Sequence, residues 1–330
     1  LLRPAVFSGC ALVFMFCFSS FGIVLILGGP SYSTIEAEIY RQAAHLFNLP
    51  VASVLSLVQI GFTFMLLWGY TLLSRKKAGK SSQTSSDQLK KAVFLWEKLL
   101  VAGVVLFILG LCVMPLLVLV IHSLMHDGKM TFVFYRALFD NISGSVFYVP
   151  PVHAIGNSLL FAALSLMIAL IIGGCAALFI HYSEKTFKHR LTSFFDPIFM
   201  LPLSTSAVTL GFGIIITLDT PPLNLRSSVF LVPIAHALVG FPFVVRAILP
   251  ALRAMPDHLW EAAQVLGASP WQIFKTIDLP TISRSLVAGA VFAFTISLGE
   301  FGATVFAARP QTPTIPIAIY RFLGQPGAMN

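Results

Sequence analysis

A polar segment between two long apolar runs carries regularly spaced functional groups. It begins with Glu261-Ala262-Ala263, continues after three residues with Gly267, and reaches Ile277-Asp278-Leu279-Pro280 after nine more. The Glu261 carboxylate can accept hydrogen bonds from donors on another protein or from the start of its own helix. The two alanines keep the neighbouring surface low, so that such a protein could approach closely. These residue types predict a contact site for a partner protein.

A second carboxylate, Glu300, lies within an apolar stretch and is flanked by Gly299 and Phe301. A charged side chain at the middle of a bilayer costs a few kcal/mol, so it should face protein or a water-filled cavity. One interpretation is that these three residues line a solute pathway or its gate. The other is that Glu300 lies near the outer interface and is satisfied by donors at a helix end.

No residue pattern in the sequence indicates an enzyme or a resident cofactor. The sequence has no Gly-x-x-x-x-Gly-Lys-Ser/Thr loop, no His-Glu-x-x-His and no Gly-x-Ser-x-Gly. His122, His126 and His153 have no second ligand pair at a recognisable spacing, so no metal site is predicted. The four cysteines lack Cys-x-x-Cys spacing and are interpreted as packing residues.

The elements that must position these groups are membrane-spanning helices. Hydrophobic residues make up 57% of the 330 residues and charged residues only 10%, against about 25% charged residues in an ordinary soluble domain. Apolar runs of roughly 20 residues match a bilayer core of about 30 Å, and a spanning backbone must satisfy its own hydrogen bonds. We therefore predict an all-α polytopic membrane protein. Asn157-Ser158 is expected to cap the start of its fourth span. The seven predicted spans are residues 5–28, 51–74, 99–123, 157–180, 194–217, 228–250 and 285–308.

The basic residues assign the two sides of the membrane. The net charge is +8, and alternating the loops and helix ends places fifteen of the 21 Lys and Arg residues on one side and six on the other. The richer side is cytoplasmic by the positive-inside rule. The segment from Glu261 to Pro280 falls on that side. This distribution accounts for the positive charge without a nucleic-acid partner.

The same segment predicts a hairpin of two short helices. Residues 257–266 are expected to be helical, and Gly267 suits the left-handed backbone that follows a helix. Ser269-Pro270-Trp271-Gln272 is typical of a new helix start with a capping box. Pro280 disfavours helical geometry at Leu279, so the second helix is expected to end near that residue.

The pattern from Glu261 to Pro280 resembles the EAA loop of bacterial ABC-import permeases, and it meets that pattern at every position. The resemblance implies the type I ABC importer permease fold in a bacterial inner membrane, with no catalysis by this chain. It also implies cytoplasmic ABC ATPase subunits, expected as a homodimer that binds ATP and Mg, and a periplasmic or lipid-anchored substrate-binding protein. The ATPase-coupling residues that it implies are Glu261, Ala262, Ala263, Gly267, Ser269, Pro270, Ile277, Leu279 and Pro280.

The two ends of the chain resemble each other at an offset of 280 residues. Residues 2–50 align without gaps with residues 282–330, and a match that continues through polar loops at one register indicates an internal repeat. Ser20 corresponds to Glu300, which makes Ser20 a further candidate pathway residue. The matched pairs include Gly9 with Gly289, Phe21-Gly22 with Phe301-Gly302, Thr34-Ile35 with Thr314-Ile315, and Ile39-Tyr40-Arg41 with Ile319-Tyr320-Arg321.

The repeat predicts two fused permease halves. Residues 1–74, with two spans, are the end of the first half, and residues 75–98 form a cytoplasmic linker whose basic cluster could contact membrane lipid. Residues 99–330 are the second half, with five spans and the EAA loop at 256–280. We also expect a first copy of that loop upstream of Leu1 and a final span after residue 330.

Local similarities within the family suggest the solute. Residues 14–22, 27–30 and 34–40 are most similar to thiamine-type permeases, whereas residues 298–304 are also similar to molybdate-type permeases. Fused double permeases also serve iron(III). Thiamine is therefore the predicted solute, with iron(III) or a molybdate-type anion as alternatives. An ATP-independent secondary transporter is a rival interpretation that leaves the docking hairpin unexplained.

Overall fold

The computed structural model describes residues 10–324 apart from 11–12, 15–16, 19, 29–31, 79–93, 127, 140–148, 187–197, 204, 219–220, 222–224 and 226–227. The chain divides into two compact units. The first consists of Leu1–Tyr70 and His153–Asn330, and the second of Thr71–Val152. The first unit contains the hairpin segment and Glu300.

Helices make up nearly all the regular structure of both units. The second unit holds α5 (Leu95–Leu124), α6 (Val133–Ala137) and the short antiparallel strands β1 (Met125–His126) and β2 (Lys129–Met130), with Met125 opposite Met130. Two long helices, α4 (Leu49–Ala78) and α7 (Pro151–Thr186), lie mostly in the first unit. The other elements of the first unit are α2 (Gly22–Leu27), α3 (Ile35–Tyr40), the π-helix η1 (Arg41–His45), α9 (Ala207–Leu218), α10 (Leu231–Arg253), α11 (Asp257–Val265), α12 (Pro270–Ile273), the π-helix η4 (Phe274–Asp278), α13 (Leu279–Gly299), α14 (Thr304–Ala307) and α15 (Ile315–Leu323).

Long apolar helices confirm the prediction of an all-α polytopic membrane protein. Within the described part of the chain, five helices are long and apolar enough to cross a membrane. No described residue of α5 is buried, as expected for a helix whose surroundings are apolar. The five segments are Leu49–Leu66, Leu95–Leu124, Pro151–Glu184, Leu231–Arg253 and Pro270–Gly299.

Two predicted spans are wrong as continuous helices. In the span 194–217, the helix is interrupted at Thr205 and Ser206, and α9 begins only at Ala207. Ser206 Oγ accepts the Thr209 backbone N–H at 3.4 Å, which satisfies a donor at the new helix start. In the span 285–308, the helix ends at Gly299 because Glu300 adopts extended backbone, and α14 begins after a short turn. Of the predicted span 5–28, the structure describes residues 10, 13–14, 17–18 and 20–28, including α2; most of the predicted linker lies outside the described residues.

The predicted role of Asn157-Ser158 as a helix-start cap is also wrong. Helix α7 begins at Pro151, so both residues lie inside it. Asn157 Nδ2 donates to the Pro313 carbonyl at 3.1 Å, and Ser158 Oγ accepts the Ile315 N–H at 2.8 Å. The pair therefore caps the start of α15 from a different helix, across more than 150 residues of sequence.

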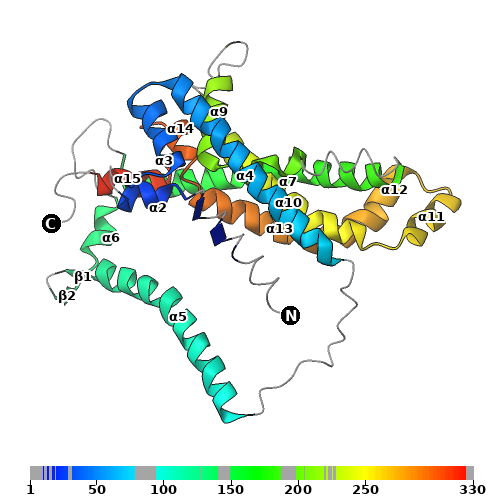
Figure 1. Cartoon of the computed structure of the whole chain (residues 1–330), viewed down its shortest axis with the longest axis horizontal. Helices are drawn as coiled ribbons and strands as arrows, with labels where there is room; N and C mark the ends of the chain where they lie inside the picture. Colours follow the sequence, from blue (N-terminus) through cyan, green and yellow to red (C-terminus); the bar gives the residue numbers. More distant parts are fainter. Residues whose placement is uncertain are drawn as a thin grey trace. The chain divides into compact units, whose positions relative to one another are not determined.

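The core of the first unit lies around α10, which packs between α7 and α13 (Figure 1). Small residues allow these helices to approach closely, as is common in membrane bundles. A Cβ at Gly173 of α7 would lie 2.8 Å from Val244 Cβ, and a Cβ at Gly289 of α13 would lie 3.2 Å from Val244 Cα. Val244 itself is fully buried. This packing holds α13, the helix that directly follows the hairpin segment, against α10.

Candidate functional site

The predicted hairpin is present, with α11 and α12 at the end of α13 that lies away from α14 (Figure 1). Gly267 follows α11 with φ +78°, a conformation that residues with a side chain rarely adopt. Ser269 and Gln272 form the predicted capping box, in which Ser269 Oγ accepts the Gln272 N–H and Gln272 Oε1 accepts the Ser269 N–H at 2.7 Å. Local sequence therefore determines the turn between the two helices.

The tip of the hairpin is apolar and open to solvent. Val265 and Leu266 are 87% and 86% exposed, and Trp271 is 69% exposed. Glu261 and Ala262 are also exposed, while Ala263 is half-buried. Large apolar side chains held outward on a rigid turn are typical of a protein contact surface.

The base of the hairpin is anchored to the membrane helices. Ile273 is 2% exposed, and Ile277 packs against the core around α10. Asp278 is fully buried and accepts two hydrogen bonds, from Tyr182 Oη at 2.5 Å and from Trp260 Nε1 at 2.9 Å. The Asp278 carboxylate thus joins α7, α11 and η4.

Sequence reasoning placed Asp278 in the motif but gave it no function. Its partner Tyr182 is 96 residues away along the chain. The available signal was the carboxylate itself, because a charged residue directly before Leu279-Pro280 at the start of an apolar run needs a partner.

The predicted end of the second hairpin helix at Leu279 is wrong. Leu279 is helical, with φ −60° and ψ −45°, and the chain passes from α12 through η4 into α13 without a break. The π-helix uses the wider i→i+5 hydrogen bond, which the Leu279 N–H donates to the Phe274 carbonyl. Pro280 then occupies the first turn after the π-helix, where its missing N–H is tolerated.

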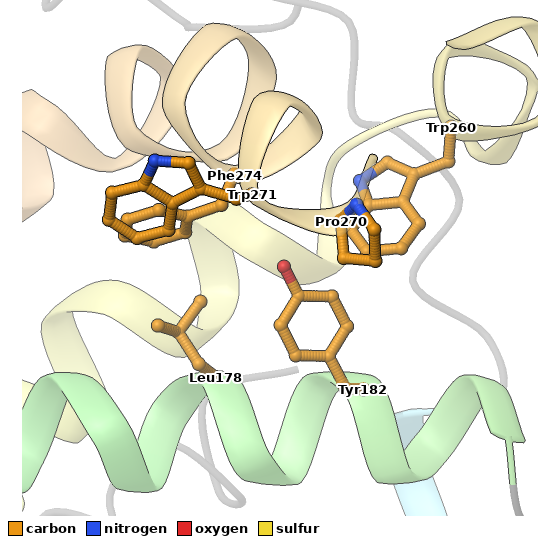
Figure 2. A pocket seen from close by; sticks show the side chains of 6 residues that line it. All are labelled: Leu178, Tyr182, Trp260, Pro270, Trp271 and Phe274. Atoms are coloured by element: carbon orange, nitrogen blue, oxygen red, sulfur yellow. The ribbon is translucent and has the colours of Figure 1, made fainter. Parts of the chain in front are cut away.

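An open apolar pocket of about 470 Å³ lies between the hairpin and α7 (Figure 2). Figure 2 shows the Tyr182 hydroxyl directed at the hairpin, with the stacked rings of Trp271 and Phe274 beside it. The hairpin is thus held to α7 at its base, while its outer part has space around it. The pocket is lined by Leu178, Tyr182, Trp260, Pro270, Trp271 and Phe274.

The candidate pathway residues lie at the opposite end of α13. Gly299 is its last residue, and Glu300 follows in extended conformation with 9% exposure. The Glu300 carboxylate accepts the Ala303 N–H at 3.0 Å. Phe301 stacks on Phe21, and Ser20 lies next to Phe21 in the chain. Helix-end donors therefore do satisfy Glu300, in accordance with the second interpretation of this residue.

A buried polar network near Glu300 was not predicted from the sequence. Gln59 Nε2 donates to Glu36 Oε1 at 2.7 Å, and Thr209 Oγ1 donates to Gln59 Oε1 at 3.1 Å. Glu36 and Gln59 are each 1% exposed. The pKa of Glu36 is raised to about 7: burial is the largest cause and the nearby Glu300 carboxylate a smaller one, and together they outweigh the lowering by hydrogen bonds from Ser206 and Gln59. The network joins α3 and α4 to α9.

His236 forms a second buried junction, between α10 and the break after α13. Its Nδ1 lies 2.7 Å from Ser297 Oγ, and its Nε2 lies 2.6 Å from Thr304 Oγ1. Thr304 Oγ1 in turn donates to the Glu300 carbonyl at 2.7 Å. The three contacts hold the two sides of the break in one position. Where the structure describes side chains, no group of three or more His, Cys, Asp or Glu residues could hold a metal ion.

Comparison with known proteins identifies the part of the chain that carries these features. Residues 169–323 match the family of binding-protein-dependent transport system inner membrane components. This range includes the hairpin, α13 and Glu300. The chain carries a permease domain of this family. Together with the five membrane-length helices, the match makes the chain a multi-pass protein of the bacterial inner membrane.

Relatives of this permease extend the similarity over most of the chain. It is 26% identical over 320 residues to the thiamine transport system permease protein ThiP of Haemophilus influenzae, covering 95% of this chain and 56% of that protein. It is 48% identical over 98 residues to the molybdenum transport system permease protein ModB of the same organism, covering 29% of this chain and 43% of ModB. A putative 2-aminoethylphosphonate transport system permease protein, PhnV of Salmonella paratyphi A, is 29% identical over 168 residues, covering 47% of this chain and 62% of PhnV. The chain thus spans about half the length of the first two relatives.

Proposed function

We propose that this chain is the membrane-spanning subunit of an ATP-driven importer that takes a small solute from an external binding protein. The observation that carries the proposal is the hairpin, with its exposed apolar tip and its buried base. In this proposal the tip, including Glu261 and Ala262, docks into a cytoplasmic ATPase, which binds ATP and Mg and performs the hydrolysis. The chain itself contributes no catalytic residue.

The continuous helix from the hairpin into the membrane supports a direct mechanical coupling. Pro270–Gly299 is an unbroken helical segment of 30 residues, and at 1.5 Å per residue it is about 45 Å long. A displacement of the hairpin by the ATPase would therefore reach the level of Glu300 through one rigid element. The hydrogen bonds of Asp278 would carry the same displacement to α7.

Co-purification of the chain with its ATPase tests the docking role. We expect Leu266→Ser to remove most of the co-purifying ATPase and the ATP-dependent uptake, because Leu266 and Val265 are the most exposed large apolar side chains of the tip. Gln264→Ser, at a neighbouring exposed polar position, is the matched control and should retain both. Full uptake by Leu266→Ser, or uptake by the original chain without ATP, would refute the proposal and favour a secondary transporter.

We further propose thiamine as the solute, supported by the similarity to ThiP across 95% of the chain. A molybdate-type anion is the second candidate, supported by the higher identity to ModB over 98 residues. Uptake of labelled thiamine and labelled molybdate into cells that express the complete transporter separates the two. The thiamine proposal predicts uptake of thiamine that excess unlabelled thiamine abolishes and excess molybdate leaves unchanged; the reverse pattern assigns the chain to the anion.

A further inference from the structure

Two aromatic rings that correspond in the internal repeat stack on each other. Phe21 and Phe301 have ring centroids 5.4 Å apart and an interplanar angle of 23°, and their residue numbers differ by the repeat offset. Phe21 is 6% exposed. Gly22 allows the close contact, because a Cβ there would lie 3.2 Å from Phe301 Cδ1. The rings meet where the first predicted half contacts the second.

Each of these rings also packs on a tyrosine of its own repeat. Phe21 lies 5.6 Å from Tyr40, and Phe301 lies 5.4 Å from Tyr320, measured between ring centroids. Tyr40 and Tyr320 correspond at the same offset, and Tyr320 is an electrostatic neighbour of Tyr40. Burial, followed by this neighbour, raises the pKa of Tyr40 to about 12.

The stack between the equivalent rings is the contact that a local two-fold axis between the two halves would produce. In an interface with two-fold symmetry, a residue that touches its own equivalent must lie at the axis. The Phe21–Phe301 stack meets this condition. A passage between two symmetry-related halves runs along their common axis, so the stacked rings lie in its path.

The position of the rings along α13 assigns them to the outer side. Phe301 lies two residues beyond the end of the helix, whose 21 residues from Leu279 to Gly299 span about 30 Å. The cytoplasmic hairpin lies at the other end of this helix (Figure 1). The rings therefore lie about one bilayer core away from the ATPase-coupling surface.

We propose that Phe21 and Phe301 form the outer gate of the solute pathway, closed when their rings stack and opened when the two halves move apart. The inference rests on the proposed import function. Apolar constrictions of this kind exclude water and polar solutes. The two rings share no hydrogen bond, so they can separate without leaving a polar group unsatisfied. The polar contacts nearby have a different role, because the Glu36–Gln59–Thr209 network holds α3 and α4 to α9 on one side of the gate.

Cross-linking in the assembled transporter tests whether the rings separate. Cys10, Cys17, Cys112 and Cys175 are first replaced by serine. Phe21→Cys/Phe301→Cys is then treated with a short bis-thiosulfonate reagent, with and without trapping of the ATPase in its ATP-bound state. We expect efficient cross-linking without ATP and a severalfold loss in the trapped state. Phe21→Cys/Tyr40→Cys lies within one repeat and is the control that should cross-link equally in both states.

Equal cross-linking of Phe21→Cys/Phe301→Cys in both states, in a transporter that imports solute with ATP, would overturn the gate and leave the import function standing. Absence of ATP-dependent import by the original chain would instead overturn the import function, and the gate with it.

Solute leakage through single variants gives a second, independent readout. Phe301→Ala should raise the ATP-independent solute flux through reconstituted vesicles severalfold, because the stacked pair is lost. Phe199→Ala removes an aromatic ring that packs on Phe179 and on the separate core around α10, so its flux should stay at the original level. An unchanged flux for Phe301→Ala, or an equal rise for Phe199→Ala, would contradict the gate.

Discussion

Asp278 shows how one buried carboxylate can hold a surface element in place. Its two oxygens accept hydrogen bonds from Tyr182 and Trp260, and none of its surface is exposed. A buried charge without such partners would be strongly destabilising, so both hydrogen bonds are needed for this residue to be tolerated. In the proposed mechanism, the hydrogen bonds of Asp278 transmit the displacement of the hairpin to α7.

Replacing Asp278 by Asn should weaken both the fold and the coupling. The amide offers one acceptor in place of two, so we expect a loss of about 1–3 kcal/mol of stability. We also expect less solute imported per ATP hydrolysed. Thermal unfolding of the purified chain measures the first effect, and parallel uptake and ATPase assays measure the second. Glu261→Gln changes an exposed carboxylate of the same hairpin and should leave the unfolding temperature unchanged.

Gly267 has a backbone conformation that determines which residues can replace it. A β-branched side chain at φ +78° is strained by roughly 1–2 kcal/mol, and it would change the angle between α11 and α12. We therefore expect Gly267→Val to lose ATPase association and transport while the chain still inserts into the membrane. Gly267→Asn should retain most of both, because asparagine tolerates the left-handed region. Full transport by Gly267→Val would argue against a rigid hairpin.

At the scale of elements, the contact between α7 and α10 depends on a single missing side chain. Gly173 faces Val244 and the Phe241 carbonyl, which a Cβ would approach to 2.8 and 2.9 Å. The adjacent Gly174 has nothing within 4 Å of its Cβ position. A side chain at Gly173 would thus clash with α10, whereas a side chain at Gly174 has free space.

This difference predicts opposite effects of the same substitution. Gly173→Ala should force the helices apart and cost about 1–3 kcal/mol, as overpacking does. Gly174→Ala should be neutral or stabilise the helix by up to about 1 kcal/mol, because alanine has the higher helix propensity. The unfolding temperatures of the two purified variants in detergent give the comparison. Equal effects would show that α7 and α10 are not packed at Gly173.

At the scale of the whole molecule, the positive-inside rule and the proposed ATPase docking both predict that residues 256–280 are cytoplasmic. Leu46, which is 57% exposed, lies in the connection between η1 and α4. Helix α4 is long enough to cross the membrane, and its other end leads into the basic linker, which is predicted to be cytoplasmic. Leu46 and the hairpin should therefore lie on opposite sides of the membrane.

Labelling from one side of the membrane tests this topology. In the cysteine-free chain, Val265→Cys should react with a membrane-impermeant maleimide only in inside-out vesicles. Leu46→Cys should react only in intact cells or spheroplasts. Labelling of Val265→Cys from outside would remove the basis for ATPase docking altogether.

The sequence by itself determined the features that depend on neighbouring residues. Apolar runs predict membrane helices, Ser269 and Gln272 predict a capping box, and Gly267 predicts a left-handed turn, because each of these is decided within a few residues. The rule that proline ends a preceding helix failed at Pro280, where a π-helix offered a local alternative that sequence patterns do not reveal.

Only the tertiary structure decided which distant residues meet. Asp278 finds Tyr182, Ser158 caps α15, and Phe21 stacks on Phe301, although each pair is separated by 96 residues or more. Such contacts depend on how whole helices pack, and one residue type in one segment is compatible with many packings. The repeat made Phe21 and Phe301 equivalent in sequence, but it was the packing of the first unit that brought them face to face.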